Sequence, residues 1–536
     1  MNRAALILTS LAAGIIAGYY GATWLTGLAV ICAGVAVRLL IAVMIRRNPL
    51  NFTYATRLHY VWPCLVFIGI GVCDVARSLE WPSGLPDNLE AGFTVRVRER
   101  VAMTSGDRYL VDILDYVTAG VENASSPVRC RGMRGYLYLD PAEHRLPGDI
   151  LHISATVRRL ENSRPGGAGY MLRIFGRPQT VDDSRRGSLH NRVSALRDDF
   201  IIFIERSPLG RDTTGLLRAL LAGDTGGLDQ AQIGSMRDAG VAHSIAVSGM
   251  HVGILTVVLL WLTMPLNLWH GRRVRYALVL AGVWIFVLLS GVHFSTLRAA
   301  LMFSFVALAV MTERRRNAFS MLCFATMLIL LVNPVALWDV GLQLSFACVA
   351  ALTLFVEPLI PVDHRNHPVA YRLSSMALTT LVATGATWVL TAYYFSSVPV
   401  HFMVSNLVIL PLLPLFLVAG SGLLLLHWLG VDVSTLAVWL EELPRWMYRL
   451  TGAMRGSALT VEVTSLIVWC WIGGLALLAL SLHWRRSTAP CLPGAIPRGD
   501  LVRYGDSPPP FMPLLLPASA LLLLSIILTT INSGAN

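Results

Sequence analysis

The sequence predicts a polytopic α-helical membrane protein with a small external all-β domain, OB-like in kind, inserted after the third transmembrane helix. Of the 536 residues, 55% are apolar and only 14% are charged, whereas a soluble domain carries about a quarter charged residues. Apolar runs of roughly 20 residues, the length that lets a helix cross the hydrocarbon core, recur along most of the chain. One stretch, residues 88–180, alternates instead between apolar and polar side chains. This composition excludes a soluble enzyme.

The apolar runs leave one long gap before residue 241. The first run is not a cleaved signal peptide, because it leads almost directly into the second and no small-residue cleavage site separates them. We predict spans at residues 4–20, 23–45, 58–76, 241–264, 274–291, 296–312, 317–333, 337–357, 374–396, 400–427, 464–483 and 511–532. The predicted parts are transmembrane helices over 1–77, a transmembrane channel domain over 241–483, a cytoplasmic loop over 484–510 and a C-terminal transmembrane helix over 511–536.

Arginine clusters predict the orientation, since short cytoplasmic loops of membrane proteins are rich in basic residues. For the same reason, the formal net charge of +11 does not by itself indicate an acidic partner. With a cytoplasmic N-terminus, the third span delivers residues 78–240 to the outside. The basic clusters that belong inside are Arg46–Arg47, Arg272–Arg273 with Arg275, Arg314–Arg316, and Arg485–Arg486.

One stretch, residues 400–427, conflicts with this orientation. If it crosses the bilayer once, Arg485–Arg486 falls outside. Because Pro411 and Pro414 interrupt the stretch, we predict that it dips into the bilayer and returns as two half-segments. Residues 433–455 repeat apolar side chains at helical spacing opposite charged ones, a pattern typical of a helix lying in the membrane interface. That helix would rest on the outer surface, and the C-terminus would be external.

Residues 78–190 form the predicted external β domain, and residues 191–240 form amphipathic helices that connect it to the next span. Short alternating stretches separated by turn sequences such as Pro147-Gly148-Asp149 indicate a small barrel or sandwich. OB barrels often bind single-stranded nucleic acid through a basic groove. The weak candidates for DNA contact are Arg158, Arg159 and Arg173. A cap resting on the membrane domain is the equally favoured alternative.

Catalytic, cofactor and metal motifs are missing from the sequence. The eight cysteines show no metal-ligand spacing with one another or with histidine. There is no phosphate-binding GxxxxGK[ST] loop and no GxSxG motif. We therefore predict no cofactor, no metal and no enzymatic activity. Ser248 with a neighbouring histidine gives the least favoured alternative, an intramembrane hydrolase, because no orienting carboxylate lies nearby in the sequence.

Polar residues inside apolar spans mark candidate functional positions, because such groups are costly in the bilayer. His243, Ser248, Gly249 and His251 head the span 241–264. The two histidines are predicted either to line a pore or to hydrogen-bond between helices. Gly249 and Gly253 have the spacing of small residues at close helix contacts, which favours a packing role for the glycines.

The later spans carry further candidates, namely Ser295, Arg298, Gln343, Ser345 and Asn406. The Arg298 guanidinium would either snorkel to the outer interface or offer its donors to a phosphate in a channel. The other side chains would line a path or hydrogen-bond between helices.

These motifs resemble those of the ComEC family, inner-membrane channel proteins of bacterial natural transformation. The similarity rests on Leu220-Leu221-Ala222-Gly223-Asp224, on Ala246-Val247-Ser248-Gly249-Met250-His251, on Ser295 with Arg298-Ala299, on Gly341-Leu342-Gln343-Leu344-Ser345, and on Asn406 with Pro411. The resemblance implies a multi-pass protein of the bacterial inner membrane with residues 78–240 in the periplasm. It also implies passage of single-stranded DNA to the cytoplasm, with a cytoplasmic helicase as partner.

Many members of this family continue into an external metallo-β-lactamase-like nuclease domain, whereas this sequence ends at Asn536 without that domain's HxHxDH motif. We therefore expect a separate periplasmic nuclease, or a paralogue that does not serve transformation. The predicted path residues are His243, Ser248, Gly249, His251, Ser295, Arg298, Gln343, Ser345 and Asn406. The alternative function is a secondary transporter of a small anionic solute, which would enclose a small midplane site rather than a wide bore.

Overall fold

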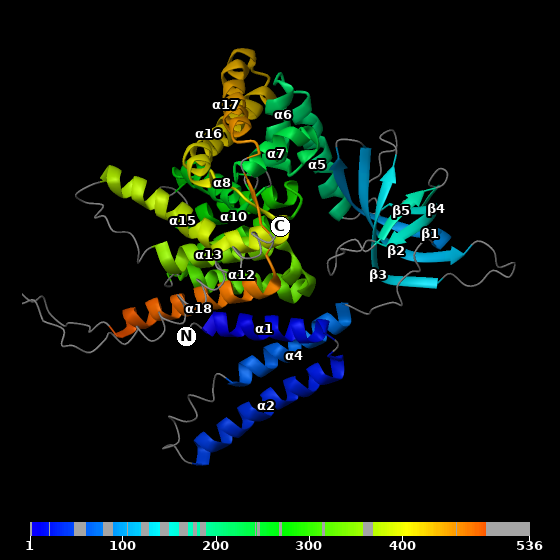
Figure 1. Ribbon diagram of the computed structural model, residues 1–536, viewed down its shortest axis with the longest axis vertical. Coiled ribbons are helices and arrows are strands. Elements are labelled where there is room, and N and C mark those ends of the chain that lie inside the picture. Colours follow the sequence, from blue (N-terminus) through cyan, green and yellow to red (C-terminus); the bar gives the residue numbers. More distant parts are fainter. Residues whose placement is uncertain are drawn as a thin grey trace, which may run out of the picture. The chain divides into compact units, whose positions relative to one another are not determined.

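The computed structural model (Figure 1) describes residues 3–20, 22–47, 61–78, 89–103, 106–118, 128–139, 149–159, 170–174, 179–182, 189–241, 243, 247–266, 271–313, 317–356, 368–456, 458–461 and 463–488. These residues are mostly helical and include one small β domain, which follows the third described helix, as predicted. The chain divides into two compact units. The first comprises Met1–Gly234, Ala242–Gln343 and Leu410–Leu450, and the second comprises Ser235–Val241, Leu344–Ile409 and Thr451–Asn536.

The N-terminal helices are α1 (Arg3–Tyr19), α2 (Trp24–Arg47) and α4 (Val61–Ser78). Both α1 and α2 pack on α4 through glycines, which let the backbones approach closely. A Cβ added at Gly14 would lie 2.0 Å from the carbonyl oxygen of Ile68, and one added at Gly69 would lie 2.5 Å from that of Gly27. The helices match the first three predicted spans to within a few residues.

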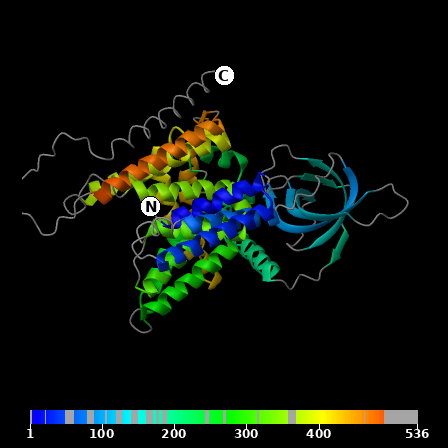
Figure 2. The same ribbon diagram turned by 90° about the horizontal axis from the view of Figure 1, so that it is seen from below.

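The described strands of the β domain curve into a barrel, most clearly in Figure 2. They are β1 (Leu89–Met103), β2 (Gly106–Thr118), β3 (Val128–Leu139), β4 (Ile150–Arg159), β5 (Tyr170–Ile174) and β6 (Gln179–Asp182). Their order is β1-β2-β3-β5-β4-β6, and a further pairing of β1 with β4 closes five of them into a ring. The pair β3–β5 is parallel, and the other pairs are antiparallel.

The barrel interior is apolar because successive side chains of a strand point to opposite faces. On β1, Phe93, Val95 and Val97 are buried, while the intervening Thr94 and Arg96 are partly exposed. Tyr109, Leu137, Leu151 and Leu172 fill the same core from the other strands. The alternation read from the sequence therefore predicted the inward face correctly.

Between the β domain and the next apolar helix lie α5 (Leu189–Glu205), α6 (Arg211–Leu217) and α7 (Gln230–Asp238). A π-helical turn, η2 (Arg218–Ala222), and a 3₁₀ turn, η3 (Thr225–Gly227), separate α6 from α7. These elements occupy most of residues 191–240, where connecting helices were predicted.

A core of four apolar helices follows: α8 (Gly249–Leu262), α10 (Gly271–Leu289), α11 (Phe294–Met311) and α12 (Ala318–Val332). Buried Val252, Val283, Val287 and Ala300 join α8, α10 and α11. The helix α8 begins eight residues later than the start of the predicted span 241–264, because Ser248 is extended and caps it.

The remaining described elements are η5 (Pro334–Trp338), α13 (Val340–Ala351), η6 (Leu352–Val356), α15 (Pro368–Phe395), β7 (Ser397–Val398), α16 (Phe402–Trp428), α17 (Ser434–Ala453), β8 (Leu459–Thr460) and α18 (Ser465–Thr488). The helix predicted over 433–455 is present as α17. The predicted C-terminal span and residues 489–510 of the predicted loop lie outside the described residues.

The prediction that residues 400–427 form two half-segments is wrong, because α16 is one 27-residue helix with Pro411 and Pro414 inside it. Each proline lacks the N–H that would bond the carbonyl four residues earlier. Apolar helices tolerate this loss where neighbouring groups or local adjustment satisfy the freed carbonyls. Proline therefore marks a weak point in such a helix rather than its end.

Three described helices are long and apolar enough to cross a membrane by length and composition: Phe294–Met311, Ser374–Phe395 and Phe402–Trp428. Apolar helices of 10–17 residues accompany them at Ala4–Tyr19, Leu25–Leu39, Val61–Val75, Gly249–Leu262, Ala318–Val332, Val340–Val356 and Ser465–Leu475. Together they indicate a membrane protein.

Candidate functional site

The head of α8 is built around a buried histidine. His251 has no exposed surface, and its Nδ1 accepts a hydrogen bond of 3.0 Å from the backbone N–H of Ser248. The Ser248 hydroxyl lies 3.0 Å from the same nitrogen. A side chain that reaches back from the third helical position to the N-cap N–H is half of a capping box, in which Glu or Gln is the usual residue. Here histidine takes that place.

This contact decides what His251 can do chemically. In a neutral ring whose Nδ1 accepts a hydrogen bond, Nε2 carries the proton and is a donor. Nε2 is buried and has no hydrogen-bond partner among the residues that the structure describes. A buried donor of this kind can serve a ligand oxygen or a water molecule.

The same contact argues against a serine nucleophile. The lone pair of Nδ1 faces both the backbone N–H and the hydroxyl of Ser248, so it is not reserved for taking the hydroxyl proton. No carboxylate hydrogen-bonds Nε2 among the described residues. The contact that an intramembrane hydrolase would require is present, but its geometry is that of a helix cap.

Arg298 lies in α11 beside the head of α8. Its side chain is only 2% exposed, and a Cβ added at Gly249 would lie 3.8 Å from Nη2 of Arg298 and 3.4 Å from Cβ of Ala299. A snorkelling guanidinium would reach water, so the snorkelling alternative is wrong. The structure places Ser248, Gly249, His251 and Arg298 in one cluster, which we call the α8–α11 cluster.

The packing alternative for Gly249 and Gly253 holds only in part. The Ala299 distance at Gly249 is an ordinary van der Waals contact, and no described atom lies within 4 Å of a Cβ added at Gly253. The two glycines therefore do not form a close helix–helix contact in the described chain. The small residue at 249 leaves room beside the Arg298 guanidinium instead.

A tight turn at Gly223 packs against the turn between α10 and α11. Gly223 has φ +67°, and a Cβ added there would lie 2.6 Å from the Ser290 carbonyl oxygen and 2.9 Å from His293 Nε2. His293 is the N-cap of α11. The Arg197 Nε donates a 2.9 Å hydrogen bond to the carbonyl of Ala222. These contacts hold the connecting segment against the turn that leads into α11.

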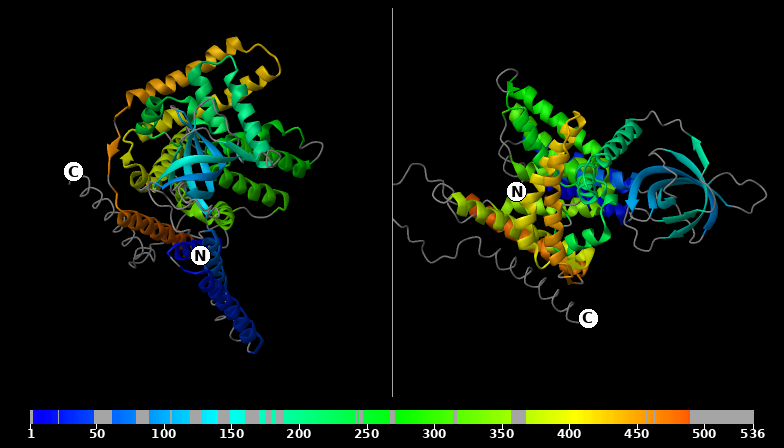
Figure 3. Two further views of the ribbon diagram at one scale, coloured as in Figure 1. Left: turned by 90° about the vertical axis from the view of Figure 1, so that its right-hand side faces the viewer. Right: turned by 90° about the horizontal axis from the view of Figure 1, so that it is seen from above.

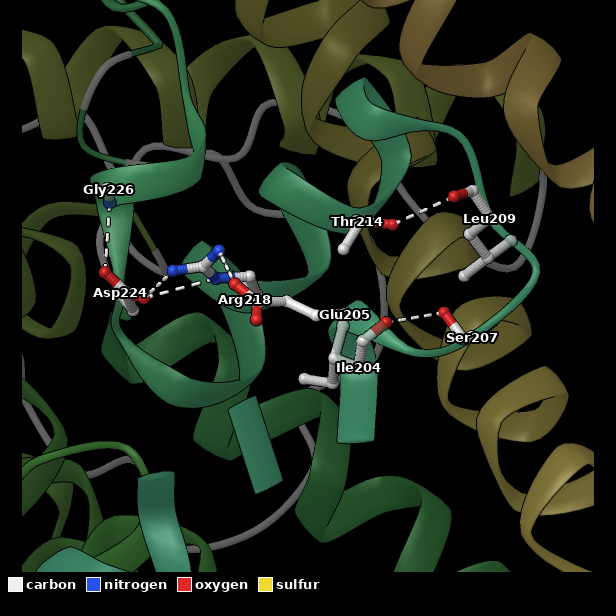
Figure 4. Close-up of polar contacts among 8 residues, drawn as sticks. All are labelled: Ile204, Glu205, Ser207, Leu209, Thr214, Arg218, Asp224 and Gly226. Atoms are coloured by element: carbon white, nitrogen blue, oxygen red, sulfur yellow. Dashed lines mark hydrogen bonds and ion pairs between the residues drawn. The ribbon is translucent and has the colours of Figure 1, made fainter. Parts of the chain in front are cut away.

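Asp224 and Arg218 stabilise that turn (Figure 4). The Asp224 carboxylate accepts hydrogen bonds from Nε of Arg218 at 3.2 Å, from Nη2 of the same side chain, and from the Gly226 N–H at 3.0 Å. Arg218 also pairs with Glu205. Burial raises the pKa of Asp224, but the hydrogen bonds and charge of Arg218 outweigh it and leave the pKa below its ordinary value. Asp224 lies in one of the sequence motifs, whereas no sequence pattern indicated a role for Arg218.

The other predicted path residues are dispersed. His243 is exposed, and Ser295 is half-buried in the first turn of α11. The Gln343 side chain donates to the Leu337 carbonyl at 2.8 Å, a contact with the preceding turn η5. Ser345 and Asn406 belong to the second unit.

Asn406 is 8% exposed, and its Oδ1 is buried without a hydrogen-bond partner among the described residues. It is thus a second buried polar group with unused hydrogen-bonding capacity, on a different unit from the α8–α11 cluster.

The candidate DNA-contact arginines lie on two paired strands of the barrel. Arg158 is exposed on β4 and is paired in register with Met171. Arg159 is opposite Tyr170, and Arg173 is opposite Thr156. No group of three or more His, Cys, Asp or Glu side chains that could hold a metal ion occurs among the described residues.

Comparison with known proteins identifies the helical part of the chain. The sequence pattern of the family described as "Competence protein" matches residues 220–487, half of the 536-residue chain. ComE operon protein 3 of Bacillus subtilis (strain 168) is 28% identical over 261 residues, which are 48% of this chain and 32% of that protein. Competence protein ComA of Neisseria gonorrhoeae is 30% identical over 206 residues, 37% of this chain and 28% of that protein.

The aligned segment therefore spans less than a third of the length of either relative. No solved structure matches the chain. The α8–α11 cluster, the Gly223 turn and Asp224 all lie inside the matched residues, which confirms the resemblance drawn from these motifs. The chain belongs to the competence protein family.

Proposed function

We propose that this protein takes part in DNA uptake for competence by passing single-stranded DNA across the bacterial inner membrane. The observation that carries the proposal is the buried α8–α11 cluster within the region that matches the competence family. A phosphate crossing an apolar bundle must remain solvated or paired. Arg298 supplies a permanent positive charge with several donors, and His251 supplies a buried N–H.

The proposed orientation follows the arginine clusters. The protein would be multi-pass with a cytoplasmic N-terminus, and residues 78–240 would lie in the periplasm. The closed strand order of the β domain is consistent with an OB-like barrel, a fold that binds single strands through a basic face. We propose that this domain receives DNA through Arg158, Arg159 and Arg173. We further propose that a nuclease and a cytoplasmic helicase act with this protein.

The alternative of a small-solute transporter loses one of its supports. It rested partly on a helix broken at Pro411 and Pro414, the arrangement in which transporters expose backbone groups to a substrate. Because α16 is continuous, that feature is absent from the described chain. The buried polar groups are compatible with either function.

Transformation in a naturally competent host tests the proposal. The host's own channel gene is deleted, the wild-type chain or a variant is supplied, and transformants are counted beside labelled DNA held in the periplasm. Arg298→Ala should reduce transformants about tenfold or more, since losing one charged hydrogen bond costs about 1.5–3 kcal/mol. Periplasmic DNA should be unchanged.

Arg272→Ala is the matched control, because Arg272 is half-exposed and pairs with Glu313 at the surface. It removes the same charge outside the cluster and should transform within about twofold of wild type, as surface pairs contribute little. Equal transformation by the two variants at equal membrane abundance would remove Arg298 from the path. If the deletion itself leaves transformation intact, the transporter alternative takes precedence.

A further inference from the structure

We propose that α16 and α17 form a hairpin that does not cross the membrane. The face of the hairpin that points away from the connecting helices α5–α7 would contact lipid. This lipid belongs to the leaflet on the same side of the membrane as those helices. The proposal concerns the placement of these two helices and is independent of what the protein transports.

The chain enters α16 and leaves α17 at the same place. Ser397 of β7 pairs with Thr460 of β8, and Val398 pairs with Leu459. Close by, the Ser405 hydroxyl near the start of α16 contacts Met454 Sδ after the end of α17 at 3.2 Å. A segment whose two ends lie together crosses a bilayer twice or not at all.

Both ends of this segment adjoin the end of the connecting helices. The Asp238 carboxylate, at the end of α7, accepts a 2.7 Å hydrogen bond from the Gly456 N–H. A Cβ added at Gly240 would lie 2.8 Å from Pro399. The segment that precedes α8, the turn before α16 and the turn after α17 therefore share one side.

The charged side chains of α17 argue against two crossings. Midway along α17, the Glu441 carboxylate accepts a 2.6 Å hydrogen bond from the Gly210 N–H, between α5 and α6. It also pairs with Arg445 at 3.0 Å, and Glu442 pairs with Arg445 beside it. A crossing α17 would carry these charges through the bilayer centre at a cost of about 2.5–3.5 kcal/mol for each charged residue on insertion scales. The contact with Gly210 would also draw the polar connecting segment inward.

The other helix of the hairpin packs on the same segment. A Cβ added at Gly420 of α16 would lie 2.6 Å from a methyl carbon of Leu217 in α6. The Phe203 ring of α5 lies 5.8 Å from the His427 ring. Both helices thus lie along the connecting helices rather than away from them.

Exposed tryptophans indicate that lipid covers the outer face of the hairpin. On α17, Trp439 is 74% exposed and Trp446 is 61% exposed, while Glu441 on another side of the helix faces Gly210. On α16, Trp428 is 70% exposed and Leu415 is 56% exposed. Tryptophan at the border of an apolar surface is typical of the membrane interface, and an apolar face opposite a charged one is typical of a helix that lies in it.

This placement resolves the conflict that the sequence left at Arg485–Arg486. Because β7 pairs with β8, α18 begins on the side where α16 begins. In Figure 3 (left), the short strand β8 leads into α18. One crossing by α18 then brings Arg485–Arg486 to the side of the other arginine clusters, although α16 is one unbroken helix.

Cysteine labelling tests the placement. In a background without the eight native cysteines that keeps the wild-type gel-filtration profile, Val431→Cys is placed in the turn between α16 and α17. Asp229→Cys reports on the connecting segment, and Glu313→Cys, in the turn between α11 and α12, reports on the opposite side. A membrane-impermeant maleimide on intact spheroplasts should label Val431→Cys as well as Asp229→Cys and leave Glu313→Cys unlabelled. The proposal is overturned if Val431→Cys, like Glu313→Cys, is labelled only after the membrane is opened. It is also overturned if Val431→Cys is labelled from neither side.

A depth measurement tests the lipid contact separately. An environment-sensitive fluorophore on Trp439→Cys in proteoliposomes should be quenched more by a nitroxide near the lipid headgroup than by one near the chain end. Stronger quenching by the deep nitroxide would show that α17 crosses the membrane. Absence of quenching by either, with cross-linking between Trp439→Cys chains, would show that a second copy covers this face. Either result overturns the proposal.

Discussion

The contact between the Gly223 turn and the turn that joins α10 to α11 makes the sharpest prediction about stability. Gly223→Ala adds a methyl group at a position with φ +67°, where a side chain costs about 1–2 kcal/mol. The methyl carbon would also lie 2.6 Å from the Ser290 carbonyl oxygen. This oxygen belongs to the backbone and cannot rotate away, so overpacking adds about 1–3 kcal/mol. The total expected loss is about 2–5 kcal/mol.

Gly430→Ala is the matched control. Gly430 has φ +79°, but no described atom lies within 4 Å of its added Cβ. This variant therefore carries the backbone cost of about 1–2 kcal/mol without the steric one. The difference between the two variants isolates the close approach of the turn to Ser290.

The assay is the fraction of monodisperse protein that survives heating in detergent, followed by gel filtration of a fluorescently tagged chain. Because unfolding of a large membrane protein is rarely reversible, midpoint temperatures are compared rather than free energies. The Gly223→Ala midpoint should fall clearly below that of Gly430→Ala. Equal midpoints would refute the packing of the Gly223 turn on Ser290 and, with it, the support that this turn gives to α11.

Four further variants test other parts of the structure. Because the folded-state pKa of Asp224 is depressed, the stability that this carboxylate contributes is present above about pH 4 and is lost as pH falls further. Asp224→Asn should therefore lower the midpoint temperature at pH 7 and remove this acid-dependent loss. Phe93→Ala, at a fully buried barrel position, should lower the stability of the β domain by about 3–5 kcal/mol and make it sensitive to trypsin. Arg158→Ala should leave the domain resistant to trypsin and weaken binding of single-stranded DNA at low salt. Pro411→Ala should restore a helical hydrogen bond and leave the midpoint unchanged or higher, while a drop would indicate that the proline is needed for the shape of α16.

Apolar periodicity and alternation predicted most of the fold because each depends on residues close in sequence. The helices α10, α11 and α12 begin and end within about three residues of the predicted spans, as expected of such readings. The barrel core around Phe93 follows directly from two-residue alternation. What failed was a rule that comes from soluble helices, namely that Pro411 and Pro414 interrupt a helix.

The contacts that build the candidate site depend on structure that local patterns do not specify. Arg218 and Asp224 are six residues apart, a spacing that does not bring side chains together on a regular α-helix. They meet because the π-helical turn η2 and the left-handed Gly223 turn the chain back on itself. Likewise, His251 takes a capping position where Glu or Gln is expected, so its role could not be predicted from spacing.

The burial of Arg298 is the point at which fold and proposed function depend on each other. A guanidinium at 2% exposure in an apolar bundle is stabilised only by groups that meet its charge or hydrogen-bond its donors. A protein that used Arg298 for packing alone would gain stability from a large apolar residue of similar volume, such as methionine. Arg298→Met therefore separates the two roles: thermal stability equal to or above wild type together with loss of transformants would show that the charge is retained for transport. Loss of both would show that Arg298 holds the bundle together, and normal transformation would remove it from the path.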